Sequence, residues 1–285
     1  TILPGLIDAH THVLFSQEAN EDFAEHSIQS LTMESDALRT LRGAKRAKSY
    51  LAEGITSIKD LGNSGLYLDV ALRDAINEGT IEGPRIFASG PILAANGGQI
   101  YGVLPEHQNI IDLEYRIITS PEDAKNAVRE HVNQNVDVIK ICADNIPNKT
   151  YLTIDEIKSI VKTAHSYNLK VTAHSVTNQS AWNAIEAGVD VIDTAISPLS
   201  MGTSQPSVES IVASLRNSEY EFSVNDKLFI EFSDYIESIL PKYEKHFSNQ
   251  ISSRVDAPVD NIIGFFFLLI FFIKTISVKS EEAIL

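Results

Sequence analysis

The stretch Leu3–His12, LPGLIDAHTH, is the basis for interpreting the rest of this chain. Leu6 and Ile7 form an apolar pair that leads into a polar end carrying His10 and His12. Side chains on a strand alternate between faces, so the two histidines point the same way, about 7 Å apart. At the end of a buried strand, two such imidazoles can bind one metal ion. The alternative is a pair of ordinary polar residues, since histidine is intermediate in burial.

This stretch resembles the first-strand signature of the amidohydrolase superfamily, in its prolidase-like and imidazolonepropionase-like branch. The resemblance covers about residues 1–190, and the order and spacing of its motifs make it specific. The further motifs are ITSIKDLG (Ile55–Gly62), EGPRIFASG (Glu82–Gly90), VDVIKIC (Val136–Cys142) and KVTAHS (Lys170–Ser175). The resemblance implies that the two histidines bind one metal of a one- or two-metal site inside a (β/α)₈ barrel.

Composition narrows the class of protein. The 285 residues suffice for one large domain, and 44% hydrophobic and 21% charged residues are ordinary for a globular protein. A net charge of −15 argues against nucleic acid as a partner, because phosphate binding needs a basic surface. Cys142 is the only cysteine, so no internal disulfide is possible. No signal peptide is visible, and we favour the cytoplasm. An oligomer is possible but not indicated.

Alternating strand and helix signals predict a parallel α/β fold. We expect an incomplete TIM-type (β/α) barrel in which about six strands are recognisable. The strands after the first are expected at Ile55–Asp60, Arg85–Gly90, Val136–Cys142, Lys170–His174 and Val189–Ile196. The chain starts at Thr1 on the first strand with no initiator Met, so we expect a fragment. In the resembled family a small β-domain precedes this strand.

Helices are expected between and after these strands. Ser16–Glu34 shows no clear period, and Ala94–Thr119 is long and irregular, as active-site loops often are. The expected helices are Asp36–Glu53, Leu66–Glu78, one starting at Pro121 behind a Ser120 cap, one opened by a capping box at Thr153 and Glu156, Asn178–Ala187, Ser207–Arg216 and Lys227–Leu240.

A second resemblance begins near the sixth strand. VDVIDTAISPLSMGTSQPSVESIVASL (Val189–Leu215) resembles the last strand and helix of the carboxyltransferase domain of biotin-dependent decarboxylases and carboxylases. The resemblance spans about residues 184–246. We interpret the chain as a chimera, either a natural recombinant or a gene-assembly artefact. Its parts would be a partial barrel (1–197), a helical segment packing on it (198–247) and an unassigned tail (248–285).

Two features belong to these later parts. Thr203 resembles a threonine that moves a proton between biotin and pyruvate in the carboxyltransferases. The alternative is a turn or cap residue before the helix at Ser207. Ile262–Ile273 is a 12-residue apolar run. A membrane span needs about 20 such residues, so a membrane anchor is not favoured. We expect the tail to lie outside the barrel core.

Lys140 lies in an apolar strand, where a charged amine is costly unless it is paired or modified. The resemblance implies that it carries a carbamate that bridges two metals, and that His174 is the next metal ligand. The alternative for Lys140 is a side chain that extends toward the barrel mouth. The implied metal ligands are therefore His10, His12, Lys140 and His174, with carbamylated Lys140 as the catalytic residue. The metal would be divalent, with zinc favoured, as one or two ions.

Two parts of the family pattern are missing. Thr194 stands where the family has another metal-binding His, and no strand carries the Asp expected after the eighth strand. Asp256 and Asp260 lie in a stretch without a strand pattern. General acid–base help, worth about 10²–10⁴-fold, would be lost without that Asp. We therefore expect a metal-dependent hydrolase of C–N bonds, in a dipeptide, N-acyl amino acid or cyclic amide, with poor or no turnover. The alternatives are a non-catalytic metal-binding fragment and a carboxyltransferase-related fragment of a biotin-dependent enzyme.

Overall fold

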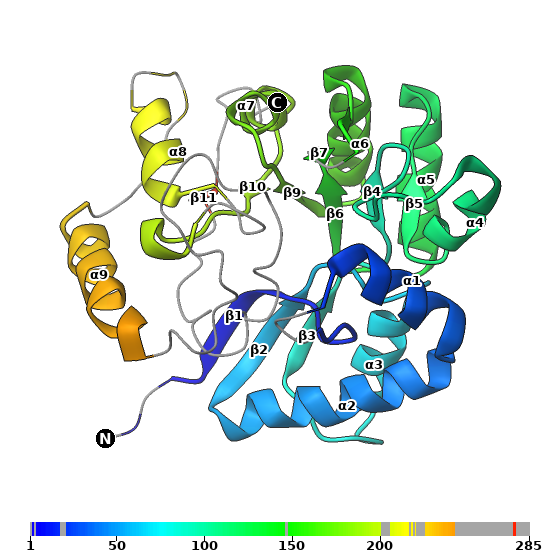
Figure 1. The fold of residues 1–285 in the computed structure, drawn as a ribbon, viewed down its shortest axis with the longest axis horizontal. Helices are drawn as coiled ribbons and strands as arrows, with labels where there is room; N and C mark the ends of the chain where they lie inside the picture. The colour runs from blue at the N-terminus through cyan, green and yellow to red at the C-terminus, as the bar shows by residue number, and fades with distance from the viewer. Residues whose placement is uncertain are drawn as a thin grey trace.

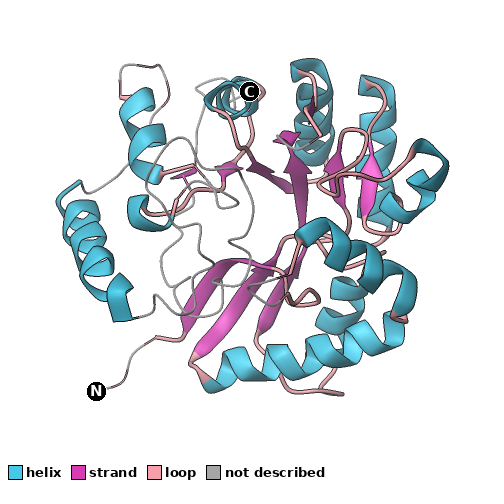
Figure 2. Cartoon of the chain, in the orientation of Figure 1, coloured by secondary structure: helices cyan, strands magenta, loops and turns pink. Residues whose placement is uncertain are grey.

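The computed structural model describes residues 2, 4–17, 21–145, 148–200, 206–216, 218, 220, 226–242 and 276–277. Strands and helices alternate along the chain, and helices surround the strands (Figures 1 and 2). All six expected strands are present and parallel. They are β1 (Leu6–Thr11), β2 (Ile55–Asp60), β3 (Arg85–Ala88), β6 (Val138–Cys142), β9 (Lys170–His174) and β10 (Val191–Ile192). The predicted α/β class is confirmed.

The strands follow the order of a barrel that does not close. One sheet has the order β1-β2-β3, and β6, β9 and β10 are successive neighbours in the other. Asp137 joins the two sheets: its backbone N–H donates to Ala88 O at 2.8 Å, and its side chain accepts from the Ala88 N–H at 2.9 Å. Within the described residues, β1 is the free edge of its sheet, and β10 pairs antiparallel with β11 (Ile276–Ser277). The expectation of an incomplete barrel is therefore confirmed.

The predicted helices bury the faces that their sequences indicate. At α6, Thr153 and Glu156 form the expected capping box, and Ile157, Ile160 and Val161 are buried. The helices at predicted positions are α2 (Asp36–Ala52), α3 (Leu68–Asn77), α5 (Pro121–Asn133), α6 (Ile154–Ser166), α7 (Asn178–Glu186), α8 (Val208–Leu215) and α9 (Asp226–Ile239). The inward face of α8 belongs to the same cluster of buried apolar side chains as the barrel strands.

Three local expectations were incomplete. Ser16–Glu34 contains α1 (Phe23–Met33), where Ala24 is buried and Ile28 and Leu31, at helical spacing from it, pack against the same buried cluster. Ala94–Thr119 is not wholly irregular. The elements in and beside it are β4 (Ile92–Ala94), η1 (Pro105–His107), α4 (Gln108–Ile111) and β5 (Tyr115–Ile117). The first residues of β1 are not buried, since Ile7 is 68% exposed at the sheet edge.

Several predictions fall outside the described residues. Thr203, Asp256, Asp260 and the run Ile262–Ile273 are among them, so their roles stay predictions. Among the helices that the structure describes, none is long and apolar enough to cross a membrane.

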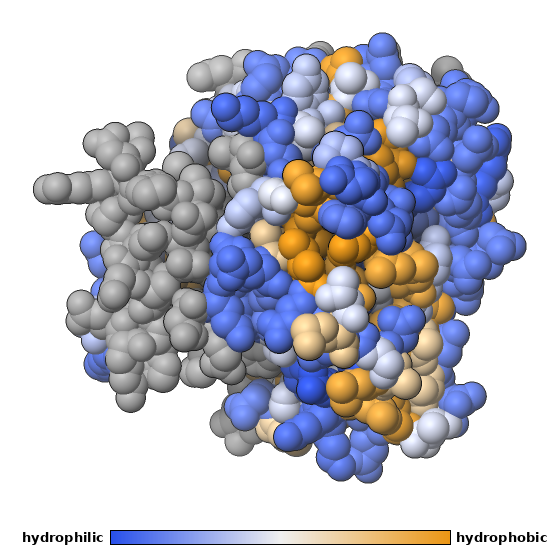
Figure 3. All heavy atoms as spheres, turned by 45° about the vertical axis from the view of Figure 1, so that its right-hand side comes forward, coloured by the Kyte–Doolittle hydropathy of each residue, from blue (hydrophilic) through white to orange (hydrophobic). Residues whose placement is uncertain are grey.

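On the face shown in Figure 3, apolar side chains gather in a band among hydrophilic ones.

Candidate metal centre

The predicted ligands lie near one another at the carboxyl ends of the parallel strands. His10 lies in β1 and His12 directly after it, Lys140 lies in β6, and His174 ends β9. Burial lowers the pKa of all three histidines, to about 3 for His12 and about 4 for His174. The charge of Lys140 lowers each of these pKa values further, so the amine is within electrostatic reach of every ring. At neutral pH the rings are uncharged and keep a lone pair for a metal.

The two histidines of the first strand have the geometry of a shared ligand pair. Their Nε2 atoms lie 3.2 Å apart. Two nitrogens bound to one tetrahedral zinc at 2.0–2.1 Å are about 3.3 Å apart, so the pair fits the ion. His12 Nδ1 lies 2.9 Å from Gly62 O. A carbonyl only accepts, so Nδ1 of His12 carries the hydrogen and its Nε2 presents the lone pair.

Asp193 is a buried residue of this centre that the sequence reasoning missed. It is 1% exposed, and its carboxylate lies 3.4 Å from His10 Nδ1. The same carboxylate forms an ion pair with Lys140 and accepts a hydrogen bond from Thr172 Oγ1 at 3.1 Å. Burial raises the pKa of Asp193, but the charges and hydrogen bonds of Lys140 and His10 together outweigh burial and hold this pKa below its ordinary value. An acid inside the apolar strand Val189–Ile196 was the signal that could have revealed it.

A second lysine faces the same interior. Burial lowers the pKa of Lys59, on β2, while the charge of Asp193 raises it and that of Lys140 lowers it. Lys59 and Lys140 therefore both interact electrostatically with Asp193. Thr194, which stands at the position of the missing family histidine, is fully buried.

The fit of the centre to a metal is partial. Across the part of the chain that the structure describes, no three His, Cys, Asp or Glu side chains come together as a metal site. His10 and His12 supply two ligands in suitable geometry. Lys140 is held by Asp193 as an amine, and only a carbamate would turn it into an anionic ligand.

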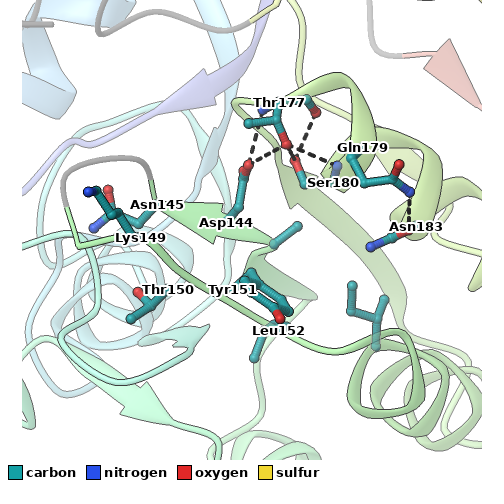
Figure 4. A pocket seen from close by; sticks show the side chains of 12 residues that line it. Asp144, Asn145, Lys149, Thr150, Tyr151, Leu152, Thr177, Gln179, Ser180 and Asn183 are labelled. Atoms are coloured by element: carbon teal, nitrogen blue, oxygen red, sulfur yellow. Dashed lines mark hydrogen bonds between the residues drawn. The ribbon is translucent and has the colours of Figure 1, made fainter.

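A cavity of about 520 Å³ lies between the hairpin of β7 (Asp144–Asn145) and β8 (Thr150–Tyr151) and the helices α6 and α7. Leu152 and Ile157 form part of its apolar lining, and Asn183 is among its polar groups (Figure 4). The Asp144 carboxylate accepts from the backbone N–H groups of Val176 and Thr177 and thereby fixes the loop after His174. The charge of Asp144 also acts on the pKa of His174, but none of the four proposed ligands is among the residues that line the cavity.

The fold is a partial parallel α/β barrel with histidines near its strand ends, and comparison with known proteins gives its family. Residues 1–197 match the model of the amidohydrolase family. The chain therefore belongs to the amidohydrolase family.

Two relatives illustrate this membership. Ochratoxinase from Aspergillus niger is 30% identical over 210 residues, which cover 66% of this chain and 42% of the relative. A prolidase solved in complex with N-methylphosphonate-L-proline superposes with a TM-score of 0.59 at 25% identity, covering 76% of this chain and 51% of the prolidase. The chain spans less than half the length of the curated relatives it matches.

The second resemblance is also confirmed. A pyruvate carboxylase subunit from Methanocaldococcus jannaschii is 49% identical over 75 residues, which cover 26% of this chain and 13% of the relative. The chain therefore has partial similarity to a carboxylase subunit as well as membership of the amidohydrolase family.

Proposed function

We propose that this chain carries the metal-binding half of an amidohydrolase that cleaves a C–N bond in a small amide. The observation that supports it best is the His10–His12 pair, whose Nε2 atoms lie 3.2 Å apart. The amidohydrolase family generally uses divalent metals, and we propose zinc, as one or two ions. His174 and a carbamate on Lys140 would complete the ligands. When bound, such an ion activates water and polarises the amide carbonyl.

The residues of this chain position and enclose the reaction. The Gly62 carbonyl holds the His12 ring by its Nδ1–H, so that Nε2 faces His10. The lowered pKa values of the three histidines keep their rings uncharged at neutral pH. The cavity between the β7–β8 hairpin and the helices α6 and α7 would take the side chain of the substrate, because 300–1,000 Å³ is the usual size of a small-molecule pocket.

The substrate class follows from the relatives. A prolidase and an ochratoxinase are both similar to this chain. We therefore propose a dipeptide, an N-acyl amino acid or a cyclic amide as substrate. No described residue selects among these three.

A second candidate function is metal binding without turnover. It is favoured by Thr194, which cannot replace a histidine ligand, and by the ion pair that occupies Lys140. The carboxyltransferase-related alternative has less support, because that similarity covers 26% of the chain and Thr203 lies outside the described residues.

One experiment separates these proposals. The chain is stripped with a chelator and titrated with Co²⁺ or Zn²⁺, and bound metal is counted. The same samples are assayed with X-Pro dipeptides and N-acyl phenylalanine. We expect metal binding that is lost in His10→Ala, together with slow turnover. Metal binding with no turnover would support the second candidate, and the absence of stoichiometric metal binding would refute both.

A further inference from the structure

Asp193 occupies a position that the metal-hydrolysis proposal leaves without a role. Its two oxygens face different partners: Oδ1 lies 3.4 Å from His10 Nδ1, and Oδ2 pairs with Lys140 Nζ. Thr172 Oγ1 donates to Oδ1 at 3.1 Å, which fixes the plane of the carboxylate. Asp193 therefore touches two of the four proposed ligands, and it meets His10 at Nδ1, the ring nitrogen opposite the one that faces His12.

We propose that Asp193 is the positioning residue of the metal centre. One oxygen sets the tautomer and direction of His10, and the other holds Lys140 in the metal-free chain. This inference rests on the proposed function in so far as it assigns a metal to the Nε2 side of His10. Asp193 itself stays on the Nδ1 side, so it does not bind the same ion as His10 Nε2.

The tautomer argument uses only contacts within the chain. An ionised carboxylate accepts and never donates, so His10 Nδ1 carries the hydrogen when it faces Asp193. Nε2 of His10 then carries a lone pair, and this atom lies 3.2 Å from His12 Nε2, which also carries a lone pair. Two acceptors cannot form a hydrogen bond with each other, but both can bind one cation. A carboxylate that holds a histidine ligand by its second nitrogen is a recurring arrangement in metal sites.

Without Asp193, His10 and His12 can form a hydrogen bond with each other. His10 can move its hydrogen to Nε2 and donate it to His12 Nε2, which is already within hydrogen-bond distance. That arrangement satisfies both rings and removes the paired lone pairs that a metal needs. Asp193 thus selects the metal-binding arrangement over a closed histidine–histidine hydrogen bond.

Lys59 can balance the negative charge that a carbamate on Lys140 would add beside Asp193. A carbamate on Lys140 would place an anion near Asp193, and Lys59 faces the same interior from β2. Its ammonium group supplies the positive charge that both anions then need.

A purely structural role for Asp193 would predict no change in the His10 tautomer when Asp193 is replaced.

The test compares Asp193→Ala and Asp193→Asn with the unaltered chain. In the metal-free proteins, ¹⁵N-resolved NMR of His10 reports which ring nitrogen carries the hydrogen. We expect Nδ1–H in the unaltered chain and in Asp193→Asn, whose amide oxygen still accepts, and Nε2–H in Asp193→Ala. Co²⁺ titration should show affinity reduced about 10–100-fold in Asp193→Ala and less in Asp193→Asn.

Asp190→Asn is the matched control. Asp190 is a partly buried acid three residues earlier that pairs with Lys170 and His165 near the opposite end of β9. The control should change neither the tautomer nor the affinity. An unchanged His10 tautomer and unchanged Co²⁺ affinity in Asp193→Ala would overturn the inference. If Asp193→Ala does not fold, Asp193→Leu in a Lys140→Met background gives the same readout without a buried unpaired charge. If the unaltered chain binds no Co²⁺, the proposed function fails, while the NMR result still decides the role of Asp193.

Discussion

The ion pair between Lys140 and Asp193 gives the sharpest prediction about stability. The side chains are 2% and 1% exposed, so neither charge is solvated by water. Removing one member of such a pair leaves an uncompensated buried charge and costs about 3–5 kcal/mol. In Lys140→Met the Asp193 carboxylate keeps the Thr172 hydrogen bond and the nearby charge of Lys59. We therefore expect a loss at the lower end, about 3 kcal/mol.

The assay is urea unfolding of the metal-free chain at pH 7. Asp193→Asn in the Lys140→Met background should recover a large part of the loss, because the double variant buries no unpaired charge. Lys170→Met is the matched control. It breaks an ion pair whose lysine is 73% exposed, and exposed pairs contribute at most about 1 kcal/mol. The reasoning is refuted if Lys140→Met costs no more than Lys170→Met, or if the two changes at Lys140 and Asp193 destabilise additively.

Three further predictions concern the surroundings of the centre. Gly62→Ala should destabilise the chain and weaken metal binding, since Gly62 has φ +95° and an added Cβ would lie 2.2 Å from Ile92. Gly79→Ala is the control for backbone strain alone, because Gly79 has φ +82° and open space around it, and it should leave metal affinity unchanged. Burial raises the pKa of Asp60 to about 8, so the native state holds this proton more tightly than the unfolded chain does, and the free energy of unfolding should fall as pH rises from about 4 to 8. Urea unfolding across this range should show a smaller fall in Asp60→Asn. An equal fall in both proteins would contradict the assignment. Thr153→Ala should cost about 1 kcal/mol by removing the cap of α6, and a calorimetric melting temperature unchanged from that of the unaltered chain would count against the capping box.

The sequence by itself determined the strands, most helices and two of the proposed ligands. Alternation and apolar runs are local, and six strands and the inward face of α6 follow from them. The His10–His12 pair is also local, because the two residues are two positions apart at the end of one strand. Helix α1 was not predicted, although Ala24, Ile28 and Leu31 have the i, i+4, i+7 spacing of a helix face and pack on one buried cluster.

Only the tertiary structure decided how the centre is held together. Asp193 meets Lys140 across 53 residues of sequence, and the Gly62 carbonyl meets His12 across 50. Both contacts depend on which strands lie side by side and on how far each strand extends, and neither property has a local periodic signal. The sequence therefore indicated which side chains end the strands, while the packing of distant strands decided which of them orient and neutralise one another.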